Sequence, residues 1–98
     1  MVNVFHYAFD GPWSLDTNFF NIPSVYVVYT DNLCLEVGET EKLGQRLNNN
    51  SHERKKVWLK KAKKQPVKVV FLRVKNKQDR LEIKKQLRLK LSPVFGEK

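Results

Sequence analysis

Residues 24–46, SVYVVYTDNLCLEVGETEKLGQR, contain the pattern that decides the fold of this chain. The segment begins with a β-branched and aromatic run at residues 25–29, which favours an extended strand. Asp31-Asn32 interrupts that run with two turn-forming residues. Residues 33–37 then alternate with period two, which predicts a second strand, and Gly38 ends it. The segment therefore predicts a β-hairpin followed by a glycine turn.

The same alternation assigns the faces of the second strand. Leu33, Leu35 and Val37 should share one face, because side chains two residues apart point the same way. Cys34 and Glu36 should share the other face. Cys34 is the single cysteine of the chain, so an internal disulfide is excluded and a reducing compartment is indicated. We expect its thiol to serve as a small buried apolar group.

The chain after the hairpin predicts helices and one more strand. Thr40 can cap a short helix that carries Leu43 and Leu47 one turn apart. Three further elements are predicted from the apolar pattern: a helix over residues 52–64, a strand over 67–74 and a helix over 78–91. The third strand is almost continuously apolar, which is typical of a central strand covered on both faces. We expect an α+β domain with a three-stranded, mainly antiparallel sheet flanked by helices.

Residues 1–23 are interpreted as a lead-in to a core over residues 24–96, within a single domain of 98 residues. Residues 2–9 alternate as a short strand would, and residues 10–12, Asp-Gly-Pro, indicate a turn. Three aromatic residues are interpreted as anchors that hold this segment to the domain rather than as a stacking platform for bases: Trp13, Phe19 and Phe20.

Charge is distributed very unevenly along the chain, whose net charge is +9. Residues 1–41 carry six acidic and no basic residues, whereas residues 42–98 carry nineteen basic and four acidic ones. Such an asymmetry indicates a polyanionic partner for the basic half. The alternative is a lysine-rich solvated surface without a partner.

No apolar run approaches the length of a membrane span, so we expect a cytoplasmic protein without a membrane partner.

At this point the residues resemble the GIY-YIG nuclease family. Residues 24–26, Ser-Val-Tyr, stand where the family has Gly-Ile-Tyr, and residues 36–38, Glu-Val-Gly, where it has Tyr-Ile-Gly. Arg46 stands at the helix arginine. Residues 52–54, followed by Trp58, resemble one branch of the family. Residues 79–93 resemble the last helix of the family and the proline that follows it. The resemblance covers most of residues 23 to 96 and implies a GIY-YIG-like fold.

The resemblance also implies a site. The family's chemistry uses a tyrosine-assisted water, an arginine and one divalent metal held by a glutamate. Tyr26, Arg46 and His52 are the candidate catalytic residues that persist. The second-motif tyrosine is replaced by Glu36, and the metal-binding glutamate by Lys84, whose ammonium cannot coordinate a metal ion. We therefore expect no cleavage and no cofactor, with magnesium or manganese needed only if the chain is an active nuclease.

The basic half supplies candidate phosphate contacts, with DNA expected rather than RNA. The candidate nucleic-acid-binding residues are Arg46, Arg54, Lys55, Lys56, Lys60, Lys61, Lys64 and Arg80. Two of the cations, Arg80 and Lys84, fall on or beside the apolar stripe of the last helix, where an unpaired charge is costly.

Three functions remain open from the sequence. The first is a catalytically inactive, GIY-YIG-fold nucleic-acid-binding protein. The second is an active metal-dependent endonuclease in which Glu36 binds the metal, and the third is a protein-interaction module for an acidic partner. Within the first, we predict that Glu36 and Lys84 form an ion pair in place of the metal.

Overall fold

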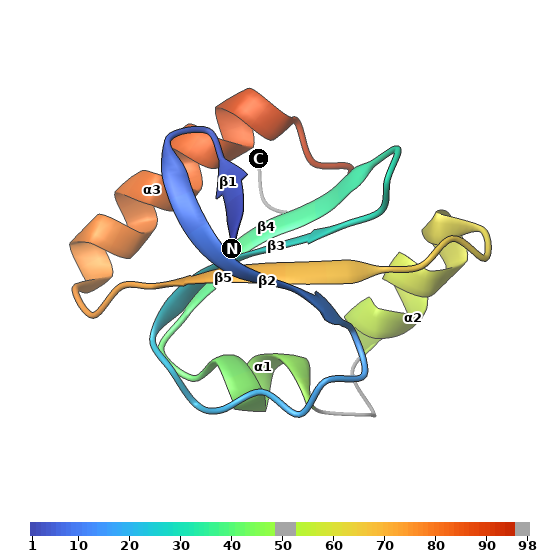
Figure 1. Ribbon diagram of the computed structural model, residues 1–98, viewed down its shortest axis with the longest axis horizontal. Coiled ribbons are helices and arrows are strands. Elements are labelled where there is room, and N and C mark those ends of the chain that lie inside the picture. Colours follow the sequence, from blue (N-terminus) through green and yellow to red (C-terminus); the bar gives the residue numbers. More distant parts are fainter. Residues whose placement is uncertain (49–52, 96–98) are drawn as a thin grey trace.

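The computed structural model describes residues 1–48 and 53–95, with only the backbone described at Glu53 and Arg54. Its elements are β1 (Val2–Val4), β2 (Tyr7–Ser14), β3 (Ser24–Tyr29), β4 (Cys34–Thr40), α1 (Leu43–Leu47), α2 (Glu53–Ala62), β5 (Lys68–Arg73) and α3 (Lys77–Leu91). Within these residues, five strands form one antiparallel sheet in the order β1-β2-β5-β3-β4 (Figure 1). The chain is an α+β domain. None of the described helices is long and apolar enough to cross a membrane.

The prediction of a three-stranded sheet was wrong, because the lead-in segment supplies two further strands. β2 pairs with β5 in a register that includes Asp10 opposite Phe71 and Trp13 opposite Val69. Phe9 is fully buried, and this burial fixes β2 against the rest of the sheet. The predicted turn at residues 10–12 instead lies inside β2, where the register shifts between Asp10 and Trp13. The central position expected for β5 is confirmed, since β5 lies between β2 and β3.

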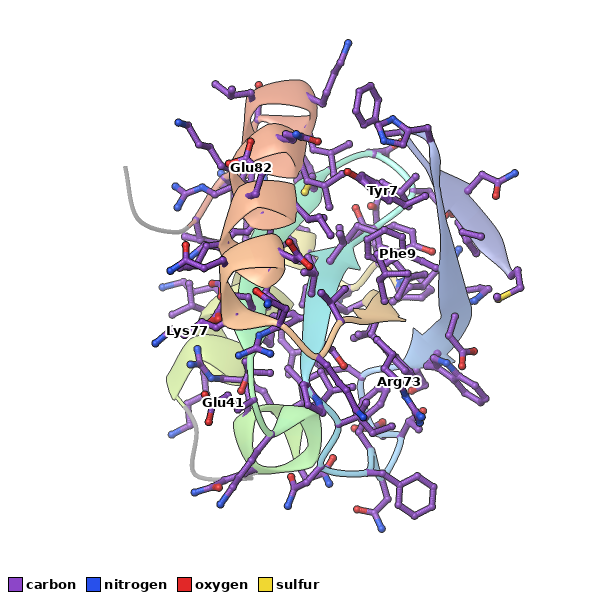
Figure 2. All side chains as sticks on the ribbon, turned by 90° about the vertical axis from the view of Figure 1, so that its left-hand side faces the viewer. Tyr7, Phe9, Glu41, Arg73, Lys77 and Glu82 are labelled. Carbon is purple, nitrogen blue, oxygen red and sulfur yellow. The ribbon has the colours of Figure 1, made fainter. Side chains whose placement is uncertain are left out.

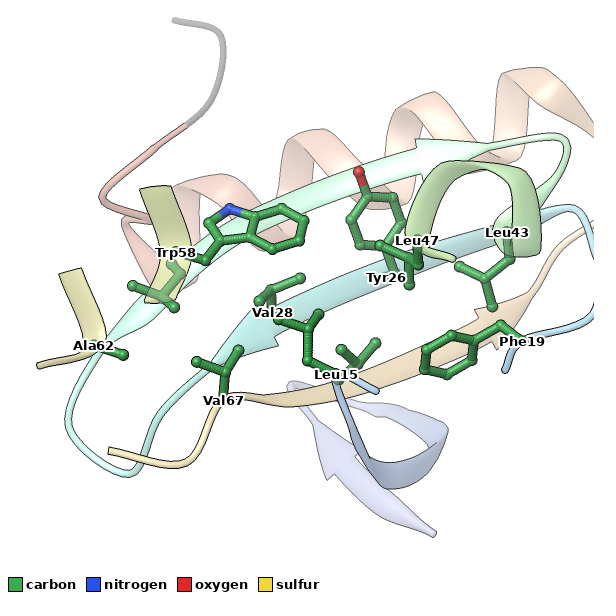
Figure 3. Packing of buried hydrophobic residues seen from close by; sticks show 11 residues of the cluster. Leu15, Phe19, Tyr26, Val28, Leu43, Leu47, Trp58, Ala62 and Val67 are labelled. Atoms are coloured by element: carbon green, nitrogen blue, oxygen red, sulfur yellow. The ribbon is translucent and has the colours of Figure 1, made fainter. Parts of the chain in front are cut away.

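Apolar side chains are buried on both faces of the sheet. Val25 and Val27 of β3 point to the side covered by α3, whereas Tyr26 and Val28 point to the side covered by α1 and α2 (Figure 3). We call the first cluster the α3-side core: Phe9, Val25, Val27, Val37, Val70 and Leu87. We call the second the α1/α2-side core: Leu15, Phe19, Tyr26, Val28, Leu35, Leu43, Leu47, Trp58, Ala62, Val67 and Val69. Figure 2 shows Tyr7 and Phe9 reaching from β2 toward α3.

A β-bulge changes the faces predicted for β4. Val28 pairs with Glu36, but the next pair is Tyr29 with Cys34, which leaves Leu35 as an extra residue. A bulge of this kind puts two residues of one strand opposite one residue of the other. Leu35 joins the α1/α2-side core and Cys34 packs against the α3-side core. The predicted grouping of Cys34 with Glu36 is therefore wrong, because Glu36 lies opposite Val28 on the α1/α2 side.

The lead-in loop caps α1 in place of the predicted Thr40. The Thr40 hydroxyl accepts from the N–H of Lys42, and Lys42 precedes the helix without a side-chain cap. The N–H groups of residues 43–45 donate instead to acceptors in residues 20–22 at 2.7–3.3 Å. These bonds satisfy donors that a helix start leaves unpaired. Phe19 is buried, so its predicted role as an anchor of this loop is confirmed. The hydrogen bonds to α1 hold the same loop in place.

Candidate nucleic-acid interface

Tyr26 and Glu36 meet on the α1/α2 side of the β3–β4 hairpin. The Tyr26 hydroxyl donates to Oε2 of Glu36 at 3.3 Å, and the two residues are 0% and 3% exposed. Gly38 lies directly opposite Tyr26 in the strand register. A Cβ at Gly38 would lie 2.4 Å from the phenol oxygen and from Cζ. The glycine therefore makes room for the tyrosine ring, which in turn holds the carboxylate.

Arg46 lies in the last turn of α1 and is half-buried. It lines a hollow of about 370 Å³ where β4 leads into α1. Glu39 and Glu41 line the same hollow, so the surroundings of Arg46 include two carboxylates. His52, the third candidate catalytic residue, lies outside the described residues.

Lys84 is on α3, which packs against the α3-side core. Its side chain is half-buried and lines a hollow along α3 together with Leu81, Lys85, Arg88 and Leu89. Residues 1–48 and 53–95 contain no ion pair between Glu36 and Lys84. The predicted pair is wrong because Glu36 points to the α1/α2 side, where Tyr26 meets its carboxylate.

Arg80 is buried, and its burial has a clear reason. Its guanidinium donates to the carbonyls of Val74 and Lys75 at 3.0 and 2.7 Å. It also pairs with Glu39 at 3.5 Å and Glu41 at 3.7 Å. A buried charge is tolerated when it is paired and hydrogen-bonded. Arg80 is 1% exposed, so it joins α3 to β4 and is not part of the exposed basic surface expected for it.

Half of the exposed lysines in the described residues lie on α2 and the turn after it. Trp58 and Ala62 are the residues of α2 that enter the α1/α2-side core (Figure 3). Lys55 is half-buried. Five lysines of this segment are exposed: Lys56, Lys60, Lys61, Lys63 and Lys64. We call these five residues the α2 lysines. The Arg54 side chain lies outside the described part of the chain.

Two exposed aromatic residues differ from the prediction that they are anchors. Phe19 is buried as expected, but Trp13 is 41% and Phe20 81% exposed. Their exposure was not predictable from residue type, because an aromatic residue in a loop is compatible with either role. A partial signal was present at Gly11-Pro12, which breaks the regular alternation just before Trp13.

Comparison with known proteins finds no family profile, curated protein sequence or solved structure that matches this chain. Among the residues whose side chains are described, no three His, Cys, Asp or Glu residues are grouped so that they could hold a metal ion.

Proposed function

We propose that this chain is a GIY-YIG-like protein that binds nucleic acid and does not cleave it. The observation that carries the proposal is the row of α2 lysines, which are all exposed. Trp58 anchors the same helix in the core, so the lysines are presented on a fixed support. Lysine clusters on one element are the usual electrostatic footprint of a nucleic-acid interface.

The placement of the motif residues supports the GIY-YIG-like part of the proposal. Tyr26 of the first motif and Gly38 of the second lie opposite each other in the hairpin, and the glycine is required by the ring it faces. Arg46 follows on the next helix. A hairpin followed by a helix is the arrangement that the resemblance implies. The predicted glycine turn is wrong, since Gly38 lies within β4 and does not end the strand.

The proposed lack of cleavage rests on two substitutions. Lys84 replaces the metal-binding glutamate of the resembling family, and a lysine ammonium cannot replace a carboxylate as a metal ligand. Glu36 replaces the second tyrosine, and its carboxylate is buried against Tyr26. A metal ion would otherwise supply several kcal/mol of transition-state stabilisation to phosphodiester cleavage.

Binding is tested by a salt series with a labelled 20-base-pair duplex. If about five phosphates are neutralised, log K should fall against log salt with a slope of about −4.5. Reversing Lys60 and Lys64 to glutamate should weaken binding to every sequence alike. The matched control reverses the charge at Lys75 and Lys77 by the same substitution to glutamate. These two lysines are also exposed, but they lie near the start of α3, at the far end of the domain from α2 (Figure 1). A salt-independent response, or equal binding to polyglutamate, would contradict nucleic acid as the partner.

Cleavage is tested separately by plasmid nicking in magnesium and in manganese. We expect no product above the metal-free background. Nicking that requires the metal and disappears in Arg46→Ala would show an active nuclease and overturn this half of the proposal, while the salt series would still report on binding.

A further inference from the structure

The two tryptophans of the chain occupy different environments. Trp58 is 1% exposed in the α1/α2-side core, whereas Trp13 is 41% exposed on β2. A tryptophan can bury roughly 150–250 Å² of surface in a core, so an open indole leaves part of that stabilisation unused. Packing within the described domain therefore leaves part of the Trp13 surface uncovered.

Trp13 lines a cleft of about 460 Å³ between β2, α2 and the start of β5. In the β2–β5 register it lies opposite Val69, whose side chain belongs to the α1/α2-side core. The indole is therefore on the side of the sheet that α2 covers. The apolar part of the lining comes from Pro12, Leu15, Leu59, Pro66 and Val67. The size of the cleft falls within the roughly 300–1,000 Å³ that small-ligand sites occupy.

The indole of Trp13 lies close to the backbone of Gly11. A Cβ at Gly11 would come within 3.2 Å of Trp13 Cδ1 and 2.9 Å of the Val69 carbonyl oxygen. Gly11 also has φ of +133°, a conformation that side-chain-bearing residues rarely adopt. The ring thus lies next to a bulged, glycine-containing stretch of β2 and lines the cleft.

The lysine that lines this cleft is Lys68, whose ammonium pairs with Asp31 at 2.7 Å, and exposed lysines lie nearby along α2. Leu59 is the α2 residue in the lining, and Lys56 lies one turn before it on the same side of the helix. Lys60 is adjacent in sequence, and Lys63 follows directly after α2; all three lysines are exposed. Asp16 is the carboxylate in the cleft lining, and it is exposed on the β2 side. The cleft therefore combines a partly exposed tryptophan with exposed lysines on the adjoining helix.

We infer that the Trp13 cleft binds one base of a single-stranded nucleic acid, stacked on the indole, while the adjoining phosphates contact the α2 lysines. This inference rests on the proposed function and adds the strandedness of the ligand. Single strands offer unstacked bases to aromatic side chains, whereas the bases of a duplex are stacked on one another. An acidic peptide would supply charge to the lysines but no flat ring for the open indole.

The experiment follows tryptophan fluorescence during titration of the full chain with a 12-base oligo-dT and with a duplex of equal length. Trp58 is in the core and supplies a constant background. Stacking on Trp13 should quench the remaining emission with oligo-dT and not with the duplex. Trp13→Ala should weaken oligo-dT binding about 5- to 150-fold, as expected for the loss of one stacked base. It should leave duplex affinity unchanged.

Two variants control for indirect effects. Trp13→Phe keeps an aromatic face and should retain most of the affinity while losing the quenching signal. Phe20→Ala removes another exposed aromatic side chain that does not line the cleft. It should change neither the affinity for oligo-dT nor the fluorescence quenching. Oligo-dT binding without quenching, and with equal affinity in Trp13→Ala, would overturn the stacking inference and leave the proposed function standing. No binding to either nucleic acid would overturn both. Tighter binding of polyglutamate, with quenching, would assign the cleft to an acidic protein instead.

Discussion

The ring of Tyr26 lies directly on the backbone of Gly38, its partner across the β3–β4 ladder. This contact explains why β4 contains a glycine within its paired length, since a glycine inside a strand ordinarily weakens it. It also positions the Tyr26 hydroxyl to donate to Glu36, two residues before Gly38. Ring, glycine and carboxylate form one buried unit inside the hairpin.

Gly38→Ala should destabilise the fold, since the new methyl group would overlap the Tyr26 ring. Overpacking a core in this way costs about 1–3 kcal/mol, measured by urea unfolding. The Tyr26→Ala background supplies the control, because removing the ring should abolish the cost of the alanine. A cost that persists in the double variant would show that the strain comes from the backbone at residue 38 and not from the ring.

Arg80→Met should cost about 2–4 kcal/mol of unfolding free energy. The substitution leaves the Val74 and Lys75 carbonyls without their donor and removes the cation beside Glu39, and buried groups that lose a charged partner are expensive. Glu41 adds little because its side chain is 71% exposed.

The matched control for Arg80 is Lys84→Met, one turn further along α3. Lys84 makes no ion pair with the described residues, so its substitution should change stability by less than about 0.5 kcal/mol. Equal losses in the two variants would contradict the structural role assigned to Arg80 and would point to a partner for Lys84.

The parts of the fold that were predictable from the sequence are those set by local pattern. The runs at Val25–Tyr29 and Val69–Leu72 and the periodicity of α3 lie where the structure has strands and a helix. The pairing of β2 with β5 was not predictable, because it depends on contacts between residues that lie 54 to 61 positions apart in the sequence. The bulge at Leu35 leaves no signal in a period-two pattern, so the face of Glu36 was assigned wrongly.

In the candidate site too, some residues were predictable from the sequence and others were not. Tyr26 and Glu36 were singled out from the sequence, and the structure brings them into a hydrogen bond. Two of the acceptors of Arg80 are backbone carbonyls, which no residue type reveals. Whether Trp13 was buried or open depended on how β2 was placed against α2. Nucleic-acid binding itself remains a prediction.

Cys34 should react slowly with alkylating reagents. Burial, reinforced by the negative charge of Glu36, raises the pKa of its thiol from 9.0 to about 11. Because the thiolate is the reactive species, a rise of that size lowers the reaction rate with iodoacetamide at pH 8 by about 100-fold relative to the urea-unfolded chain. A native rate close to the unfolded rate would contradict the burial of the thiol.

The same thiol gives a pH dependence of stability with a definite sign. A raised pKa means that the folded state holds the proton more tightly than the unfolded chain. The stabilisation is therefore complete below about pH 9 and is lost as the pH rises from 9.0 to about 11. Lysines and tyrosines also titrate in this range, so the comparison is with Cys34→Ala, whose unfolding free energy should fall less steeply across the same interval. Parallel curves for the two proteins would contradict the prediction.

Tyr26→Phe should destabilise the domain by about 1–2 kcal/mol, because it removes a hydroxyl that donates to a buried carboxylate and leaves the ring in place. Tyr29→Phe is the control on the same strand, since its hydroxyl makes no side-chain hydrogen bond within residues 1–48 and 53–95 and should cost less than about 0.5 kcal/mol. Adding Glu36→Gln should reduce the cost of Tyr26→Phe, because a neutral amide needs the lost donor less than a carboxylate does. Urea unfolding at pH 7 is measured for five proteins: the parent, Tyr26→Phe, Tyr29→Phe, Glu36→Gln and the double variant at residues 26 and 36. If Tyr26→Phe costs the same with either side chain at position 36, the hydroxyl acts independently of Glu36 and the buried unit proposed for the hairpin does not exist.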